Sequence, residues 1–306
     1  MKEQVLAIVD ELKRLKGTGV EHLYVSGEAI RSLKFLKKSE KAEKAEVEEA
    51  LASIPENIRS ASIDDFNKVL AEDPDALKAK IEGKQVPSFA KPPAVSLPEG
   101  DKQSRWNALR DLVMGCTECN KHVRAGYKLV FGVGNLDADI FFCGEAPGAE
   151  EEEQGEPFVG PAGQLLNKMI KAMGLDRSQV YIGNIMNWRP EMPTRTGNRP
   201  PKPEEMAFCM PYLKAQIEIV RPKVIVALGA TATKGLYGQE SFKALREVKG
   251  EWREFDGIPT IATYHPSYLL RNSSHSDKRK AWEDLLKVMG KIGLPISDKQ
   301  RGFFLK

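Results

Sequence analysis

The fold is decided by the stretch C-G-E-A-P-G-A-E-E-E-E-Q-G-E-P-F-V-G-P-A-G-Q-L-L, which runs from Cys143 to Leu166. An apolar run, residues 138–143, leads into it and predicts a buried strand. Residues 144–160 hold so many glycines, prolines and carboxylates that we expect a loop without regular structure. Pro161 then stands in the first turn of a predicted helix. A strand that passes through a long loop into a helix is typical of the carboxyl edge of a parallel sheet, where open α/β folds place their sites.

From residue 104 onward, apolar runs alternate with helical patterns. The predicted strands are 140–143, 180–186, 224–228 and 260–264. The predicted helices are 105–114, 163–173, 203–220, 230–236 and 277–292. This alternation indicates βαβ crossovers and a sheet that is covered on both faces. We therefore predict an α/β protein, a three-layer α/β/α sandwich around a four-stranded parallel sheet.

The chain before residue 104 differs in composition and periodicity from the rest. Residues 1–84 combine helical spacing with a charge-alternating stretch of Lys, Glu and Ala at 37–49, and we predict a helical appendage whose role the sequence does not reveal. Residues 85–103 carry four prolines and little periodicity, so we predict a linker there. Residues 104–306 are then the main domain.

Composition narrows the class of protein. The 306 residues are 41% hydrophobic and 29% charged, which is typical of a globular chain with a sizeable core. They include no signal peptide and no apolar run of eighteen residues, so we expect a soluble, cytoplasmic protein with no membrane partner. The formal net charge of +3 does not by itself indicate a nucleic-acid partner. Four cysteines, two of them spaced as C-x2-C, indicate a metal or cluster site rather than a disulfide framework.

Each predicted strand ends in polar or Gly residues, and parallel strands bring their carboxyl ends to one crevice. The amide of Asn184 offers a donor beside an acceptor, which suits a pyrimidine edge that presents C=O next to N–H. Phe158 supplies a stacking face, and His265 can donate to an oxygen that gains negative charge. The carboxylate of Glu145 can orient water or stabilise a nearby cation. Each residue alone is ordinary, but together they favour a pocket for a base that is flipped out of DNA.

Six motifs between about residues 115 and 292 carry a resemblance to a known family. They are C-T-E-C at 116–119, F-G-V-G-N at 131–135, G-E-A-P-G at 144–148, P-F-V-G-P-A-G-Q-L-L at 157–166, N-I-x-x-x-R-P at 184–190 and H-P-S-Y-L-L-R at 265–271. On these motifs the chain resembles the family 4 uracil-DNA glycosylases of the uracil-DNA glycosylase superfamily. The resemblance implies a monofunctional DNA N-glycosylase of base excision repair, which flips uracil out of DNA and hydrolyses its N-glycosidic bond to leave an abasic site. Residues 104–306 would form its catalytic domain, and no nucleotide cofactor would be needed.

The resemblance also implies a role for particular positions. Asn184 would read the uracil edge, Phe158 would stack on the base, and Ala146 would border it at the position where other members carry a water-activating aspartate. The implied catalytic residues are Glu145, Glu151, Asn198 and His265, the last donating to uracil O2 as the bond breaks. The implied DNA contacts are Gly163, Gly229, Thr231, Ser267, Tyr268, Leu269, Leu270 and Arg271. Residues 268–271 would be a loop that enters the duplex and replaces the extruded base.

One position departs from the family pattern. The family holds a [4Fe–4S] cluster on four cysteines, and Cys116, Cys119 and Cys209 match three of them. The fourth position is Trp188, whose side chain cannot bind iron. Three alternatives stay open: a cluster with three cysteines and an outside ligand, a different metal such as zinc, and a lost site with leftover thiols. A retained cluster would be structural and not required for hydrolysis.

Two other functions compete with the glycosylase. A non-catalytic protein could bind deaminated or single-stranded DNA, since the fourth cysteine is lost and the sequence leaves the water-activating group open. A Rossmann-like nucleotide enzyme would need G-x-G-x-x-G after the first strand, and residues 144–148 lack that spacing. We expect a monomer that acts on uracil-containing DNA. Residues 1–84 could contact a repair or replication protein.

Overall fold

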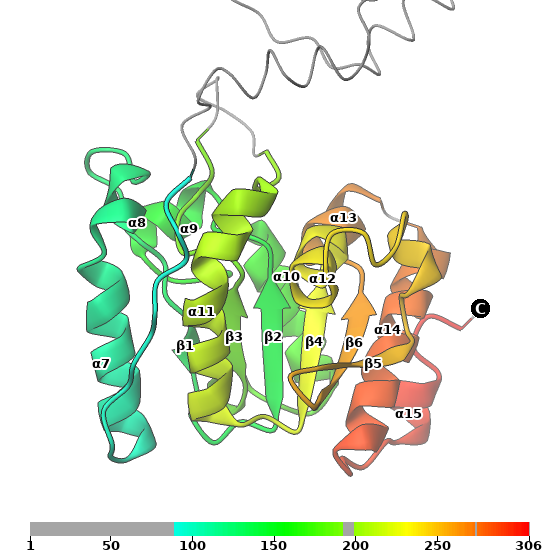
Figure 1. Ribbon diagram of the computed structural model, residues 1–306. Helices are drawn as coiled ribbons and strands as arrows, with labels where there is room; N and C mark the ends of the chain where they lie inside the picture. Colours follow the sequence, from blue (N-terminus) through cyan, green and yellow to red (C-terminus); the bar gives the residue numbers. More distant parts are fainter. Residues whose placement is uncertain (1–88, 192–198, 273, 306) are drawn as a thin grey trace, which may run out of the picture. The chain divides into compact units, whose positions relative to one another are not determined.

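The computed structural model describes residues 89–191, 199–272 and 274–305 (Figure 1). The predicted helical appendage of residues 1–84 lies outside the described residues, and so does Asn198. Everything that follows concerns the described part of the chain.

Six strands form one sheet there, in the order β1-β3-β2-β4-β6-β5. The strands are β1 Val133–Gly134, β2 Ile140–Gly144, β3 Tyr181–Asn184, β4 Val224–Leu228, β5 Trp252–Phe255 and β6 Ile258–Thr263. The four central strands run parallel and are the four that the sequence predicts. The short outer strands β1 and β5 pair antiparallel and were not predicted. The predicted α/β class is therefore confirmed, with a mixed sheet of six strands around the predicted parallel centre.

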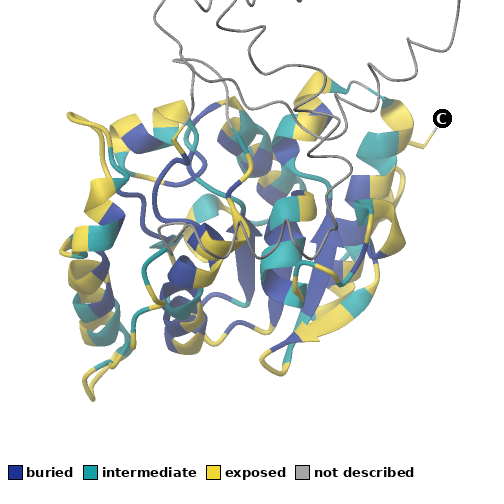
Figure 2. Cartoon of the chain, turned by 45° about the horizontal axis from the view of Figure 1, so that its top comes forward, coloured by how far each residue is buried: buried dark blue, intermediate teal, exposed yellow. Residues whose placement is uncertain are grey.

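The central strands are apolar throughout because helices cover both faces of the sheet. In β2, Phe141 and Cys143 enter one hydrophobic core, while Ile140 and Phe142 enter the other. This alternation follows from the two-residue period of a strand. Figure 2 shows the result, with dark, buried strands between helices whose outer sides are exposed.

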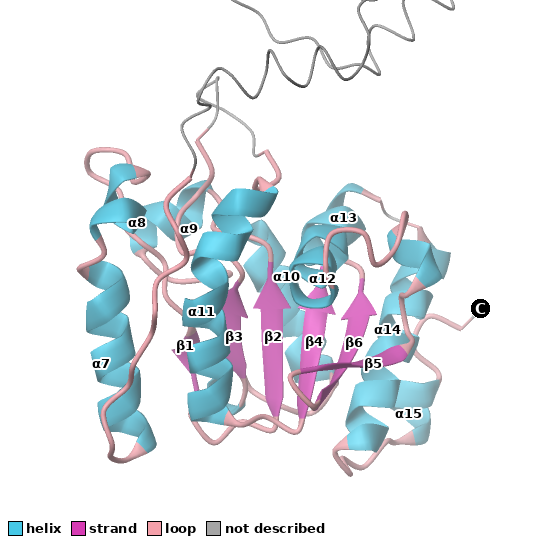
Figure 3. Cartoon of the chain, in the orientation of Figure 1, coloured by secondary structure: helices cyan, strands magenta, loops and turns pink. Residues whose placement is uncertain are grey.

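Two sets of helices form the outer layers (Figures 1 and 3). The α-helices are α7 Lys102–Met114, α8 Thr117–Lys121, α9 Ala149–Gln154, α10 Pro161–Ala172, α11 Pro203–Val220, α12 Gly229–Tyr237, α13 Pro266–Arg271, α14 His275–Lys291 and α15 Asp298–Arg301. Helices α7, α11 and α12 supply side chains to the first core, and α10 and α14 supply the second. Among the described helices, none is both long and apolar enough to span a membrane.

The predicted loop at residues 144–160 is not wholly irregular, because it contains the short helix α9. The Glu151 carboxylate accepts a hydrogen bond from the Gly148 N–H at 3.1 Å and so caps the amino end. Acidic side chains in this first turn also complement the helix dipole. Gly155, with φ of 82°, ends the helix in the left-handed conformation. The carboxylates in this segment, from which the sequence predicts a loop, thus stabilise a helix.

The predicted DNA-entering loop is also helical. Residues 266–271 form α13, which begins with Pro266 and is capped by the His265 side chain. The structure describes residues 89–103 of the predicted linker. Residues 89–101 have no helix or strand, residues 102 and 103 already belong to α7, and Phe89, Val95 and Leu97 pack against the first core. Asp101 then caps α7 by accepting a hydrogen bond from the Ser104 N–H at 2.7 Å.

Candidate active site

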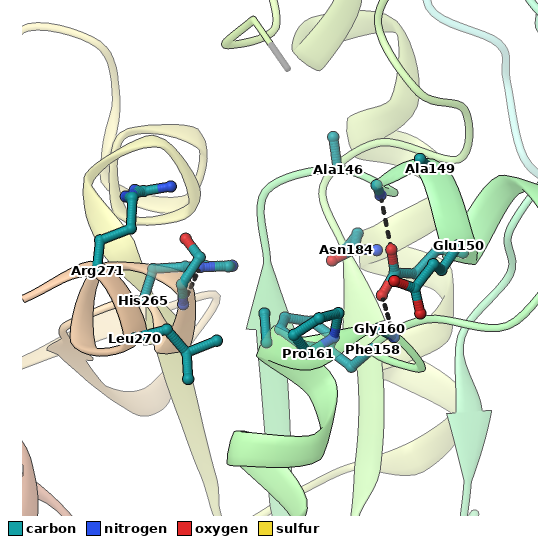
Figure 4. A pocket seen from close by; sticks show the side chains of 14 residues that line it. Ala146, Ala149, Glu150, Phe158, Gly160, Pro161, Asn184, His265, Leu270 and Arg271 are labelled. Atoms are coloured by element: carbon teal, nitrogen blue, oxygen red, sulfur yellow. Dashed lines mark hydrogen bonds between the residues drawn. The ribbon is translucent and has the colours of Figure 1, made fainter. Parts of the chain in front are cut away.

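A pocket of about 360 Å³ opens at the carboxyl ends of β2 and β3 and beside α13. Figure 4 shows its two walls: Phe158, Pro161 and the α9 region lie on one side, and residues of α13 lie on the other. The predicted site residues that line it are Ala146, Glu151, Phe158, Asn184, His265, Ser267, Leu270 and Arg271. The structure therefore brings together residues that are more than a hundred positions apart in the chain.

Asn184 forms the inner end of the pocket as the last residue of β3. Its side chain is 6% exposed, and its Oδ1 atom has no hydrogen-bond partner among the described residues. A buried carbonyl oxygen without a partner costs about 1–3 kcal/mol, so this atom is suited to a ligand N–H. Gly144 lies opposite Asn184 in the sheet. A Cβ at Gly144 would lie 2.3 Å from Asn184 Oδ1 and 2.6 Å from the Phe158 ring, so only glycine leaves both groups in place.

Phe158 forms a side wall, and its backbone is held in an unusual conformation with φ of 54°. The Arg177 guanidinium donates hydrogen bonds to the carbonyl oxygens of Phe158 at 3.2 Å and Pro157 at 2.5 Å. Gly163 of α10 packs against the same carbonyl, because a Cβ there would lie 1.8 Å from the Phe158 oxygen. The Phe158 ring is buried and lies 5.7 Å from the His265 ring, with 33° between the planes. The aromatic face is thus fixed before any ligand enters.

His265 lies on the opposite wall. Its Nδ1 atom accepts a hydrogen bond from the Ser267 N–H at 3.1 Å and lies 2.8 Å from Ser267 Oγ. Burial, together with the positive charge of Arg271, lowers the pKa of His265 to about 4. At neutral pH the imidazole is therefore neutral. Because Nδ1 is an acceptor, the proton lies on Nε2, which is free to donate to a ligand oxygen.

The two predicted carboxylates have different surroundings. Glu151 lines the pocket and accepts backbone hydrogen bonds from Gly148 at 3.1 Å, Val159 at 3.0 Å and Gly160 at 3.0 Å. It is a fixed negative charge in the pocket wall. Glu145 is not among the residues that line the pocket. Its carboxyl group is hydrogen-bonded to the Thr231 side chain, and burial raises its pKa. A raised pKa brings a carboxyl group nearer to the range in which it can exchange a proton at neutral pH.

The predicted DNA contacts divide by exposure. Tyr268 is 36% and Leu270 is 49% exposed, and Arg271 is exposed as well. Leu269, by contrast, is 4% exposed and packs inward, because it lies on the inner side of α13. Gly163 and Gly229 lie in the first turns of α10 and α12 and are buried.

Sequence reasoning missed residues that support the pocket. Arg177 lies nineteen positions after Phe158, and no local pattern links the two. Asp277 of α14 accepts hydrogen bonds from the Tyr268 hydroxyl and from Asn272 Nδ2, both at 2.9 Å. Tyr268 also stacks on Tyr264, with ring centroids 4.9 Å apart. These contacts brace α13 from behind. The pairing of Asp277 with Tyr268 spans only nine residues and gives no recognisable sequence signal.

A four-cysteine cluster would need ligands at Cys116, Cys119, Cys209 and position 188. Cys119 and Cys209 are buried, and Cys116 caps α8. Trp188, at the position of the fourth ligand, is 1% exposed and packs within the first core. Among the described residues, no three His, Cys, Asp or Glu side chains are arranged to hold a metal ion. These residues do not fit a cluster on four cysteines.

Comparison with known proteins adds an independent line of support. Residues 131–286 match the family described as the uracil DNA glycosylase superfamily. The chain is 44% identical over 190 residues to the type-4 uracil-DNA glycosylase of Thermotoga maritima, covering 61% of this chain and 94% of that protein. It is 40% identical over 182 residues to the type-4 enzyme of Archaeoglobus fulgidus (56% of this chain, 88% of that protein). It is 37% identical over 204 residues to that of Sulfurisphaera tokodaii (64% and 89%).

Proposed function

The chain belongs to the uracil DNA glycosylase superfamily, and from this premise we propose that it removes uracil from DNA by hydrolysing the N-glycosidic bond, which leaves an abasic site. The observation that carries the proposal is the buried, unpartnered Oδ1 of Asn184 at the inner end of a base-sized pocket. The hydrolysis is a DNA glycosylase reaction, as in the relatives named above.

Uracil recognition is assigned to Asn184. Uracil presents N3–H beside the C4 carbonyl, and the amide of Asn184 can accept from the first and donate to the second. Cytosine presents the opposite pattern, with an acceptor at N3 and a donor at C4, so it would leave the buried Oδ1 without a partner. Loss of that pairing costs on the order of 1–3 kcal/mol, which supports discrimination between the two bases.

Base stacking is assigned to Phe158. Its backbone is already held by Arg177 and Gly163 and its ring is buried, so little conformational freedom is lost when a base enters. Ala146 borders the same space, where its methyl group adds apolar contact and no proton acceptor. The flipped base would thus be held on a face and along an edge.

Stabilisation of the leaving group is assigned to His265. As the glycosidic bond breaks, negative charge moves onto the uracil ring and its O2 atom. A neutral imidazole with its proton on Nε2 can donate to that oxygen without transferring the proton. The Ser267 N–H supports this tautomer, because it donates a hydrogen bond to Nδ1 and so requires Nδ1 to carry no proton.

We assign stabilisation of the sugar and activation of the attacking water to the two carboxylates. Glu151 contributes a fixed negative charge in the pocket wall, which favours the positive charge that develops on the sugar. We assign proton acceptance from water to Glu145, since burial raises its pKa. Its carboxyl group would have to leave Thr231 and turn toward the pocket that the next residue, Ala146, lines. Asn198, the fourth implied catalytic residue, lies outside the described residues and remains a proposal from the motif alone.

DNA contact is assigned to α13 and to two helix starts. Leu270 and Arg271 line the pocket and are exposed, which supports assigning to them the space that the flipped base leaves in the duplex. Ser267 and Tyr268 lie on the same helix. Backbone N–H groups near Gly163, Gly229 and Thr231 are proposed phosphate contacts at the starts of α10 and α12. We further propose a monomeric, cytoplasmic enzyme whose residues 1–84 contact a repair or replication protein.

The test is excision of uracil from a labelled single-stranded oligonucleotide, followed by alkaline cleavage and direct detection of free uracil. Wild type should release uracil and create an alkali-labile site, whereas the same oligonucleotide with cytosine should stay intact. His265→Ala should slow release strongly while the oligonucleotide still binds. Tight binding of the uracil strand by wild type with no release would replace the glycosylase with a non-catalytic binding protein.

A further inference from the structure

The position of the missing fourth cysteine lies in a cluster of aromatic rings. The Trp188 and His122 rings stack at 4.8 Å with 14° between their planes, and Phe89 stacks on His122 at 5.3 Å and 12°. Phe208 meets Phe89 edge-on at 5.6 Å and Trp188 at 6.2 Å. We call Phe89, His122, Trp188 and Phe208 the aromatic plug. Stacked and edge-on pairs of this kind are favourable beyond the burial of their surface.

The plug joins the same elements that a cluster would join. Cluster ligands would come from the start of α8, from position 188 and from Cys209 in α11. The rings come from His122 at the carboxyl end of α8, from Trp188 and from Phe208, the residue before Cys209. Phe89 adds a fourth attachment through the segment that precedes α7. The connection between α8 and α11 is therefore made by side-chain packing.

The plug is also densely packed. Trp188 is among the largest fully buried side chains of the described residues, and Phe208 and Tyr212 pack edge-on beside it at 6.3 Å from one another. An indole at this position occupies space in which a cysteine would leave room for an inorganic group. Close packing of an interior leaves few voids larger than a water molecule.

We propose that this protein is an iron-free member of its superfamily, in which the aromatic plug replaces the iron–sulfur cluster as the structural link between α8 and α11. Cys116, Cys119 and Cys209 then remain as ordinary thiols. The proposal concerns the fold of the protein and does not depend on its activity.

One competing arrangement must be separated from this one. The ring nitrogens His122 Nε2 and Trp188 Nε1 are buried without a hydrogen-bond partner among the described residues. The Glu118 carboxylate lies 3.4 Å from His122 Nε2, at the long end of hydrogen-bond distance. An imidazole in this position could act as the fourth ligand beside three cysteines.

The first experiment measures iron in the full-length protein, purified without oxygen and then incubated with ferrous iron and sulfide. A relative that keeps all four cysteines is treated in parallel as the positive control. We expect wild type to bind almost no iron and to show no visible absorption band, while the control turns brown. Three or four iron atoms per chain in wild type would overturn the proposal, and their loss in His122→Ala would identify a ligand set of three cysteines and His122.

The second experiment measures thermal unfolding. Truncation of a buried Trp in an iron-free core should lower Tm by roughly 6–20 °C, so Trp188→Ala is expected to fall in that range. Trp188→Phe keeps a ring and should lower Tm less, and it remains informative if Trp188→Ala fails to fold. Trp282→Ala, in the second core, is the matched control for the loss of a buried Trp.

The cysteines supply the opposite test. In the double variant Cys116→Ser, Cys119→Ser, we expect a Tm within about 3 °C of wild type, because each change replaces one small side chain by another. An iron chelator should leave the Tm of wild type unchanged. Collapse of the fold in the double variant, or equal Tm values for Trp188→Ala and wild type, would contradict a core held by the aromatic plug.

Discussion

His265 should act as a neutral hydrogen-bond donor, and the pH dependence of excision tests this directly. Burial lowers its pKa from 6.5 to about 4. At pH 6 an unperturbed histidine would be about 75% protonated, whereas a group with a pKa near 4 would be about 1% protonated. The single-turnover rate of uracil release should therefore show no fall as the pH rises through 6.5, from 6 to 8.

The size of the His265 contribution follows from the geometry of one donor facing one oxygen. Removal of a single donor to a developing oxyanion typically costs about 10²–10³-fold in rate, so we expect that loss in His265→Ala. His265→Gln can still donate and should keep part of the rate, with no dependence on pH near 6.5. The assay is rapid-quench excision from a labelled oligonucleotide between pH 5 and 8.5. Asn184→Ala is the control, since it should lower the rate without changing the shape of the profile.

The same low pKa predicts how stability depends on pH. The folded protein disfavours the protonated imidazole, whereas the unfolded chain binds a proton near pH 6.5. Stability from this group is therefore complete above pH 6.5 and is lost as the pH falls toward 4, by roughly 3 kcal/mol at most. Nitrogen NMR of labelled His265 should show a single neutral form at pH 6. A protonated ring at that pH, or a rate that falls tenfold per pH unit above 6.5, would refute the neutral donor.

Three further outcomes can be measured in the same assays. Asn184→Ala should lower kcat/KM about 5- to 150-fold, equivalent to 1–3 kcal/mol, and unchanged kinetics would remove Asn184 from uracil recognition. Gly144→Ala would place a Cβ 2.3 Å from Asn184 Oδ1, so we expect kcat/KM to fall about 10²-fold. The control is Gly290→Ala, because a Cβ at Gly290 meets nothing within 4 Å. Asp277→Ala removes the brace on Tyr268 and should raise KM for duplex DNA about 5-fold with kcat unchanged, whereas a fall in kcat alone would argue against that role.

The parallel centre of the fold could be predicted because each central strand is a short apolar run followed by a clear helical pattern. Residues 203–220 were predicted as a helix, and α11 has the same bounds. The sequence pattern does not predict the two edge strands, because β1 has only two residues and β5 mixes charged with apolar side chains. Helix α9 is not predicted for another reason. Its four glutamates look like a solvated loop in sequence, and only the cap made by Glu151 shows that they stabilise a helix.

The candidate site was partly predictable for a physical reason. Asn184 ends strand β3 and His265 closely follows β6, and parallel strands must bring their ends together. The direction of a side chain is not encoded in this way. Glu145 directly follows β2, yet it bonds to Thr231 and does not line the pocket, and Leu269 lies within the motif but packs inward. Both outcomes depend on which face of a strand or helix the residue occupies.

The two short outer strands have a consequence for the protein in concentrated solution. An unpaired strand at the margin of a sheet is a template onto which another chain can add, and such addition starts aggregation. Here β1 offers only two residues, one of them Gly134, which gives an incoming strand almost nothing to pair with. On the other margin, β5 exposes Arg253 and Glu254, and an approaching strand would have to desolvate both charges. The sheet is thus protected from self-association on both margins by backbone length on one side and by charge on the other.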